Sequence, residues 1–303
     1  DITITNRYKK MIQLGLIDKR YQLTARPADI EENASLPVYV FIHGGDFESG
    51  AGSEPLIHGD TIVAQGTAEG NPFIAITFNY RLGMLGSHWL KDSKGGNYGL
   101  GDQKTALKWI NQNIAEFGGD IENVTLMGQG AGAMSVSILQ QTDTEEPMSG
   151  EYFTRAIMQS NPAGFDYRSY GQAEDFADKI ADYQAEMPEL DQVDLIDLPL
   201  DQLLEVQRKA SSALSQIGDW TGLSCVDLDN LVGSGVCLTS KISNETTPLA
   251  NLMPFAPYIE YKKPIFGSTI KGYHLRKQPA VDHFTVPTVV GSNTDEANST
   301  AML

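Results

Sequence analysis

Short apolar runs bounded by Gly, Pro or Asn recur along the chain. Such runs are typical of β-strands that lie inside a sheet. The run at residues 38–42, for example, reads Val-Tyr-Val-Phe-Ile and is followed at once by a glycine-rich segment. On this basis we expect strands at residues 38–42, 73–78, 124–127, 156–158 and 288–290.

Helical patterns separate these runs. In residues 102–117 apolar side chains recur at helical spacing, with Asp102 placed to cap the N-terminus and Gly118 placed to end the helix. A second helix is expected at residues 131–141. Residues 172–215 are expected to be largely helical, with apolar positions at Leu203, Leu204, Val206 and Leu214.

Strands that alternate with helices favour a mainly parallel sheet with helices on both faces. The chain has 303 residues, which is enough for one large domain with a sizeable core. We therefore predict an α/β fold and a single domain over residues 1–303.

Charge and spacing exclude several function classes. The net charge of -17 repels nucleic acid and anionic lipid, so neither is an expected partner. No apolar run is long enough for a transmembrane segment, and no His or Cys pair has metal-ligand spacing, so we expect no metal and no other cofactor. The stretch from Asp166 to Glu205 contains twelve acidic residues and only two basic ones. This stretch is either a solvated helical face or a field that attracts cationic ligands.

Several glycine-rich segments follow the predicted strands and helices in a fixed order. They are His43-Gly-Gly-Asp-Phe47, Asn79-Tyr-Arg-Leu-Gly83, Gly96-Asn-Tyr-Gly-Leu100, Asp102-Gln103, Phe117-Gly-Gly-Asp120 and Gly128-Gln-Gly-Ala-Gly132. Together they resemble the type-B carboxylesterase/cholinesterase family over about residues 36–164, and the resemblance resumes at residues 255–257 and 286–296.

This resemblance implies an α/β-hydrolase fold, in which residues 166–245 form a helical cap that walls the active-site gorge. It also implies further strands, a closing helix and the catalytic histidine beyond the last matched segment. We therefore expect the fold to be truncated at the C-terminus, and a second chain is one way to complete it.

Residues 128–132 depart from the family at the position of the catalytic nucleophile. A strand, a sharp turn and a helix form the context of the G-x-S-x-G nucleophile elbow, and the middle residue here is Gly130. Glycine has no oxygen that could attack an acyl carbon, so the nucleophile position is degenerate. The apex of such an elbow has an unfavourable backbone angle, which glycine adopts at low cost.

The resemblance also assigns the remaining parts of the catalytic site. It places the oxyanion-hole N–H groups at Gly45, Asp46 and Ala131, and it matches Glu296 to the triad acid. The family usually has a small residue at Asp46 and an acidic one at Gln129. No histidine follows Glu296 in this sequence.

Three serines near the predicted elbow are alternative nucleophiles. Ser135 and Ser137 lie on the helix after the elbow and are expected to point away from its apex. Ser160 follows a predicted strand and has no base near it in sequence. Candidate aromatic walls of a gorge, although such residues are more often part of a core, are Phe47, Trp89 and Phe165.

The chain has two cysteines, Cys225 and Cys237. The family has a short disulfide loop in this region, which implies a bond between them and an oxidising compartment, so that the protein is expected to be secreted, periplasmic or on the cell surface. Two free thiols in a cytosolic protein are the alternative.

The sequence therefore predicts an esterase-like protein without a serine nucleophile. Neuroligins, which are adhesion members of the same family, also have glycine at the elbow. We hypothesise a non-catalytic role in binding, adhesion or assembly, with a protein partner or a small ester-like ligand. The alternative is an active carboxylic ester hydrolase that uses an unrecognised nucleophile or residues outside this chain.

Overall fold

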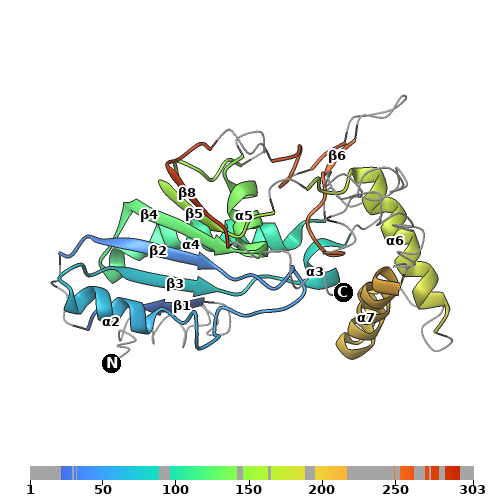
Figure 1. Cartoon of the computed structure of the whole chain (residues 1–303), viewed down its shortest axis with the longest axis horizontal. Coiled ribbons are helices and arrows are strands. Elements are labelled where there is room, and N and C mark those ends of the chain that lie inside the picture. The colour runs from blue at the N-terminus through green and yellow to red at the C-terminus, as the bar shows by residue number, and fades with distance from the viewer. Residues whose placement is uncertain are drawn as a thin grey trace, which may run out of the picture.

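A computed structural model describes most of the chain. The described residues are 22–28, 31, 33–88, 96–141, 146–162, 165–187, 195–216, 249, 253–262, 270–272, 274–279 and 284–293. Figure 1 shows a twisted sheet with helices packed along it, and a pair of helices beyond one end of the strands.

The main sheet has six strands in the order β1-β3-β2-β4-β5-β8. All neighbouring pairs are parallel except β1 and β3, which are antiparallel. The strands are β1 (Gln22–Ala25), β2 (Leu36–Ile42), β3 (Ile74–Phe78), β4 (Gly119–Gln129), β5 (Arg155–Gln159) and β8 (Thr288–Gly291). A separate two-stranded sheet pairs β6 (Tyr261–Lys262) with β7 (Ile270–Lys271).

Each of the five expected strands is confirmed, and the mainly parallel sheet is confirmed with them. Strand β4 begins before the predicted apolar run. Its first half is polar and partly exposed, and its second half passes through the core. Strand β1 was not predicted. It is a short edge strand of sequence Gln-Leu-Thr-Ala, which has no continuous apolar run.

The helices of the first half are α2 (Asp60–Ala68), α3 (Gly83–Ser87), α4 (Tyr98–Asn113), η1 (Ile114–Phe117) and α5 (Ala131–Leu139). The expected helices at residues 102–117 and 131–141 are thus confirmed, and Gly118 ends the first of them in a left-handed conformation with φ 84°. Helices α2 and α3 were not predicted.

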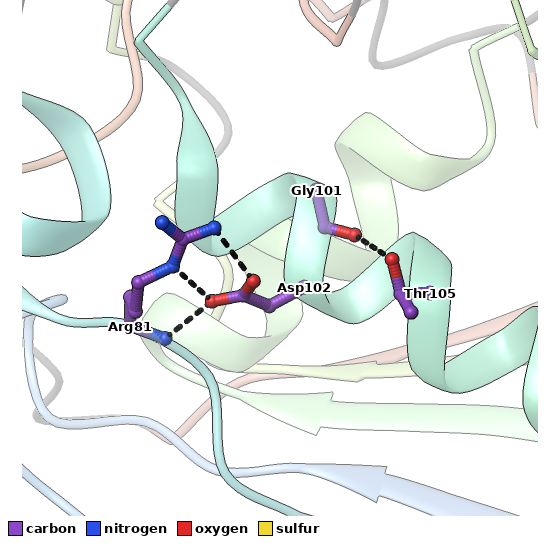
Figure 2. Close-up of polar contacts among 4 residues, drawn as sticks. All are labelled: Arg81, Gly101, Asp102 and Thr105. Carbon is purple, nitrogen blue, oxygen red and sulfur yellow. Dashed lines mark hydrogen bonds and ion pairs between the residues drawn. The ribbon is translucent and has the colours of Figure 1, made fainter.

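The expected role of Asp102 as an N-cap is wrong. The helix begins earlier, at Tyr98, and its N-cap is Asn97. The Asp102 carboxylate instead accepts hydrogen bonds from the backbone N, Nε and Nη2 of Arg81, at 2.9, 2.8 and 2.8 Å (Figure 2). Asp102 thereby ties the segment after β3 to α4. On the same helix, the Thr105 hydroxyl donates to the carbonyl of Gly101 at 2.9 Å (Figure 2).

The predicted helical region of residues 172–215 contains α6 (Tyr170–Ala185), η2 (Leu195–Asp197) and α7 (Leu200–Gln216). Helices α6 and α7 lie beyond the end of the sheet, near α3 (Figure 1). A hydrophobic cluster joins Met84 of α3, Ile180 of α6, Val206 of α7 and Phe255. This cluster anchors the helical pair beside the edge of the sheet where the candidate site lies.

Candidate functional site

The elbow lies between β4 and α5, and Gly130 is its apex. Its backbone angles are φ 57° and ψ -122°, a combination that side chains other than glycine adopt only with strain. The Gly130 N–H donates to the carbonyl of Gln159 at the end of β5, at 3.0 Å. The strained strand-to-helix turn expected of a nucleophile elbow is therefore present, with Gly130 at its apex.

The three glycines of the elbow meet different surroundings. A Cβ atom added to Gly130 would have nothing within 4 Å. A Cβ on Gly128 would lie 2.3 Å from the Gly132 backbone, and one on Gly132 would lie 2.0 Å from the carbonyl oxygen of Ile42. Gly128 and Gly132 are thus required by close packing, whereas Gly130 is favoured only by its backbone angle.

Residues 43–49, which we call the glycine loop, follow β2 and lie beside the elbow. A Cβ on Gly44 would be 2.6 Å from the carbonyl oxygen of Gln129, so the loop backbone touches the residue before the apex. Among the described residues, no acceptor faces the N–H groups of Gly45, Asp46 or Ala131. The glycine loop follows β2, Ala131 follows the elbow after β4, and these two strands are parallel neighbours. The positions expected to form an oxyanion hole therefore lie at the same edge of the sheet.

The backbone of the glycine loop is itself strained. Gly45, Asp46 and Phe47 have φ values of 107°, 58° and 62°, and two of the three are not glycine. The N–H groups of Glu48 and Ser49 both donate to the Gly45 carbonyl at 2.9 Å. The Phe47 ring is only 5% exposed and packs in the main core, as the alternative to a gorge wall allowed.

Two carboxylates lie in the glycine loop. Partial burial raises the pKa of Asp46 above its usual range. Burial also raises the pKa of Glu48, an effect that the hydroxyl of Ser211 opposes and the nearby charge of Asp46 adds to. Acidic side chains beside a row of N–H donors disfavour a developing oxyanion, since like charges repel.

His43 holds the base of the glycine loop. Its ring is buried, stacks on Tyr80 with 4.5 Å between ring centroids, and places Nδ1 2.8 Å from the Gly44 carbonyl oxygen. The Tyr80 hydroxyl donates to the His43 carbonyl at 2.8 Å. Burial lowers the pKa of His43, and its contacts with Tyr80 and Gly44 tie the ring to the base of the loop.

Comparison with known proteins identifies the group to which this site belongs. A profile of the carboxylesterase family matches residues 23–302. The chain belongs to the carboxylesterase family. Para-nitrobenzyl esterase of Bacillus subtilis (strain 168) is 46% identical to this carboxylesterase-family chain over 129 residues, which is 42% of the chain and 24% of that protein.

Neuroligins and solved esterase structures are also similar to it. Neuroligin-2 of Mus musculus is 40% identical over 166 residues, which is 54% of this chain and 18% of that protein. A thermophilic pNB esterase superposes with a TM-score of 0.53 at 34% identity, covering 63% of this chain and 38% of the other. Juvenile hormone esterase from Manduca sexta gives a TM-score of 0.53 at 29% identity, covering 81% and 38%. The chain thus spans less than half the length of these relatives.

Ser160 lies closer to the elbow than its sequence position suggested. It directly follows β5, has φ 54°, and donates its backbone N–H to the carbonyl of Gly291 at 2.8 Å. Since Gly130 binds the carbonyl of the preceding Gln159, Ser160 lies at the same sheet edge as the apex. The parallel order of β4 and β5 was the signal that could have revealed this, because carboxyl ends of adjacent parallel strands meet.

Ser135 is occupied elsewhere in this carboxylesterase-family protein. It is fully buried on α5, its hydroxyl donates to the Ala131 carbonyl, and it accepts from Nε2 of Gln103 on α4, each at 3.0 Å. Its hydroxyl thus joins α5 to α4, as expected for a residue that points away from the apex. Ser137 is half-buried on the same helix.

Several predicted residues lie outside the described part of the chain, namely Glu296, Cys225, Cys237 and Trp89. Phe165 is described and is 41% exposed. Within the described residues, no group of three or more His, Cys, Asp or Glu could hold a metal ion. No helix in the same residues is long and apolar enough to cross a membrane.

The acidic stretch forms an exposed face on α6. Asp175, Asp178, Asp182 and Glu186 are all exposed and follow one another at helical spacing, and Glu186 pairs with Lys209 of α7. This row is typical of a solvated helical face, in which the charged side chains remain in water while the opposite side of the helix packs on the protein.

Proposed function

We propose that this carboxylesterase-family protein is non-catalytic and acts in binding, adhesion or assembly. The observation that carries the proposal is Gly130, which stands at the elbow apex with the backbone angles that the nucleophile would need and without an attacking atom. The retained scaffold supports a role that needs the shape of the fold but not its chemistry.

Two features of the glycine loop add support. The Asp46 carboxylate stands where the family has a small residue, and Gln129 stands where it has an acidic one. Three departures in one small site favour divergence of the whole site over loss of the nucleophile alone. The resemblance to neuroligins favours a protein partner, and an ester-like small molecule is the second ligand class that the site would accept.

We further propose that residues 1–303 form one α/β-hydrolase domain with residues 166–245 as a helical cap. Within that cap, α6 and α7 pack on α3 through a shared hydrophobic cluster. This arrangement supports a cap that belongs to the domain. The exposed acidic side of α6 favours partners with basic surfaces over anionic ones.

Hydrolysis of p-nitrophenyl acetate and p-nitrophenyl butyrate tests the proposal. We expect the rate with the purified protein to equal the rate of spontaneous hydrolysis in the buffer alone. A para-nitrobenzyl esterase serves as the positive control under the same conditions. Saturable turnover that survives repeated purification would contradict a non-catalytic role.

An active ester hydrolase is the second candidate, and Ser160 favours it. This serine lies at the sheet edge beside Gly130 and, like Gly130, has a positive φ. If turnover is found, the variant Ser160→Ala separates the cases. Loss of turnover would assign the nucleophile to Ser160, and unchanged turnover would assign it to another residue.

A further inference from the structure

Helix α7 contacts both the glycine loop and the segment that supports it. Gln207 and Ser211 of α7 are four residues apart and thus lie on one side of the helix. One reaches α3 and the other reaches the glycine loop.

The first contact lies at the start of α3. The backbone N–H of Met84 donates to Oε1 of Gln207 at 3.0 Å. The preceding residue, Gly83, has φ 56°, and a Cβ there would lie 2.1 Å from the same oxygen. The Gly83 N–H donates in turn to the carbonyl of Phe47 at 2.7 Å. Gln207 therefore fixes the backbone that holds Phe47.

The second contact is made directly with the glycine loop. The Ser211 hydroxyl donates to Oε2 of Glu48 at 2.9 Å. Glu48 follows Asp46 and Phe47, the two non-glycine residues of the glycine loop that have positive φ. Strained residues of this kind persist only where their surroundings hold them. Here α7 contacts Glu48 directly and contacts α3, whose Gly83 N–H binds the Phe47 carbonyl.

Helix α7 is anchored firmly enough to act on the loop. Val206 and Ala210 are fully buried and Leu203 is 8% exposed, so one side of the helix is packed on the protein. Lys209 pairs with Glu186 next to the end of α6, which ties the two helices together.

We propose that α7 is a clamp for the glycine loop, in which Gln207 and Ser211 act as positioning residues that hold Asp46 and Phe47 in their left-handed conformation. The clamp thereby sets where the N–H groups of Gly45 and Asp46 point, and it connects the cap to the elbow. This inference concerns the geometry of the loop and holds whether or not the elbow is catalytic.

Amide hydrogen exchange of Glu48 and Ser49, resolved by NMR, tests the clamp. We expect exchange to be about tenfold faster in Ser211→Ala and in Gln207→Leu, since a lost hydrogen bond of typical strength corresponds to a factor of that order. The amides of β2 should be unchanged in both variants. Ser211→Thr keeps the hydroxyl and should restore slow exchange. Arg208→Gln, an exposed neighbour on the same helix, is the matched control and should behave as the native protein.

Unchanged exchange at Glu48 and Ser49 in both variants would overturn the proposal, as would an equal increase in Arg208→Gln. If the α7 variants lose the helix, Glu48→Ala decides, because it removes the same contact from the loop side. Faster exchange of Ser49 and of the last turns of α7 in that variant supports the clamp, since coupling acts in both directions. No change in either segment overturns it.

Discussion

At the residue scale, the glycines of the elbow are needed for two different reasons. Gly128 and Gly132 allow α5 to cross close to β2 and β4, because any Cβ there would meet backbone atoms. Gly130 faces open space and is favoured only by its φ of 57°. The elbow thus keeps the close packing and the sharp turn that its glycines allow.

Alanine substitutions distinguish these two reasons. Gly132→Ala should lower the free energy of unfolding by about 3 kcal/mol, because the new methyl overlaps the Ile42 carbonyl. Gly130→Ala should cost about 1–2 kcal/mol, from backbone strain alone. Gly171→Ala, in α6 with open space and no positive φ, is the control and should be neutral or stabilising by roughly 0.5 kcal/mol. Urea denaturation measures all three, and an equal cost at Gly130 and Gly132 would contradict the assignment.

Restoring the serine should not restore an esterase. Gly130→Ser has room for its side chain, but the glycine loop still carries Asp46, whose carboxylate repels a developing oxyanion. We expect p-nitrophenyl ester turnover to remain at background in Gly130→Ser. The double variant with Asp46→Gly, which suits the φ of 58°, tests whether the carboxylate is what prevents it. Fast turnover in the single variant would show that the rest of the site is intact.

At the scale of single elements, the strands were predictable because each crosses the core as an apolar run. Residues 74–78 of β3 are all buried, so their side chains leave little choice of structure. Strand β1 escaped prediction since its sequence is half polar and it lies at the edge of the sheet. The N-cap prediction for Asp102 was wrong because a carboxylate near a helix start can either cap the helix or bind a side chain elsewhere in the fold. Only the tertiary contact with Arg81 decides between these two roles.

The site was predictable to the same degree and for a similar reason. Gly130, Gly45 and Asp46 follow recognisable strands, so the parallel sheet had to bring them to one edge. The approach of Ser160 followed from the same rule and was missed. The contacts of Gln207 and Ser211 could not be predicted, because they depend on how α7 lies against α3 across more than a hundred residues of sequence.

The segment after α3 contains a buried histidine that makes stability depend on pH. His88 is 8% exposed, and burial lowers its pKa to about 4. In the unfolded chain it titrates near the ordinary value of 6.5, so below that pH the unfolded state binds more protons. Stability contributed by the neutral ring is therefore lost as the pH falls from about 6.5 toward about 4.

This dependence can be measured with His88→Gln. Between roughly pH 7 and pH 5, the native protein should lose about 2 kcal/mol of unfolding free energy that the variant does not lose. Raised pKa values at Asp46, Glu48 and Glu260 act in the opposite direction, but they are shared by both proteins and cancel in the comparison. Parallel pH profiles for the two proteins would contradict burial of a neutral His88.

At the scale of the whole molecule, the sheet has an exposed strand at one side. β8 pairs only with β5 among the described strands, and Val289 and Val290, which point to opposite faces, are 63% and 57% exposed. An apolar strand without charged residues at a sheet edge favours pairing with further polypeptide. This edge is therefore where we expect a protein partner to pair with the domain.

We therefore expect the 303-residue protein to associate as its concentration rises. Light scattering coupled to size exclusion measures the mass over a dilution series. Val290→Lys should shift the protein toward the monomer, because a charged residue on an edge strand opposes pairing. Leu56→Lys, at a residue that is 97% exposed in a loop away from this edge, is the matched control and should leave association unchanged. A monomer at every concentration would contradict the prediction.

Fluorophosphonate labelling followed by intact-mass analysis tests directly whether the protein has a working nucleophile. The reagent forms a covalent adduct with activated serines, so it reports a working nucleophile wherever it lies in the chain. We predict no adduct on the native protein under conditions that label a para-nitrobenzyl esterase completely. A stoichiometric adduct would contradict the account, and peptide mapping would then show whether Ser160 or another serine carries it.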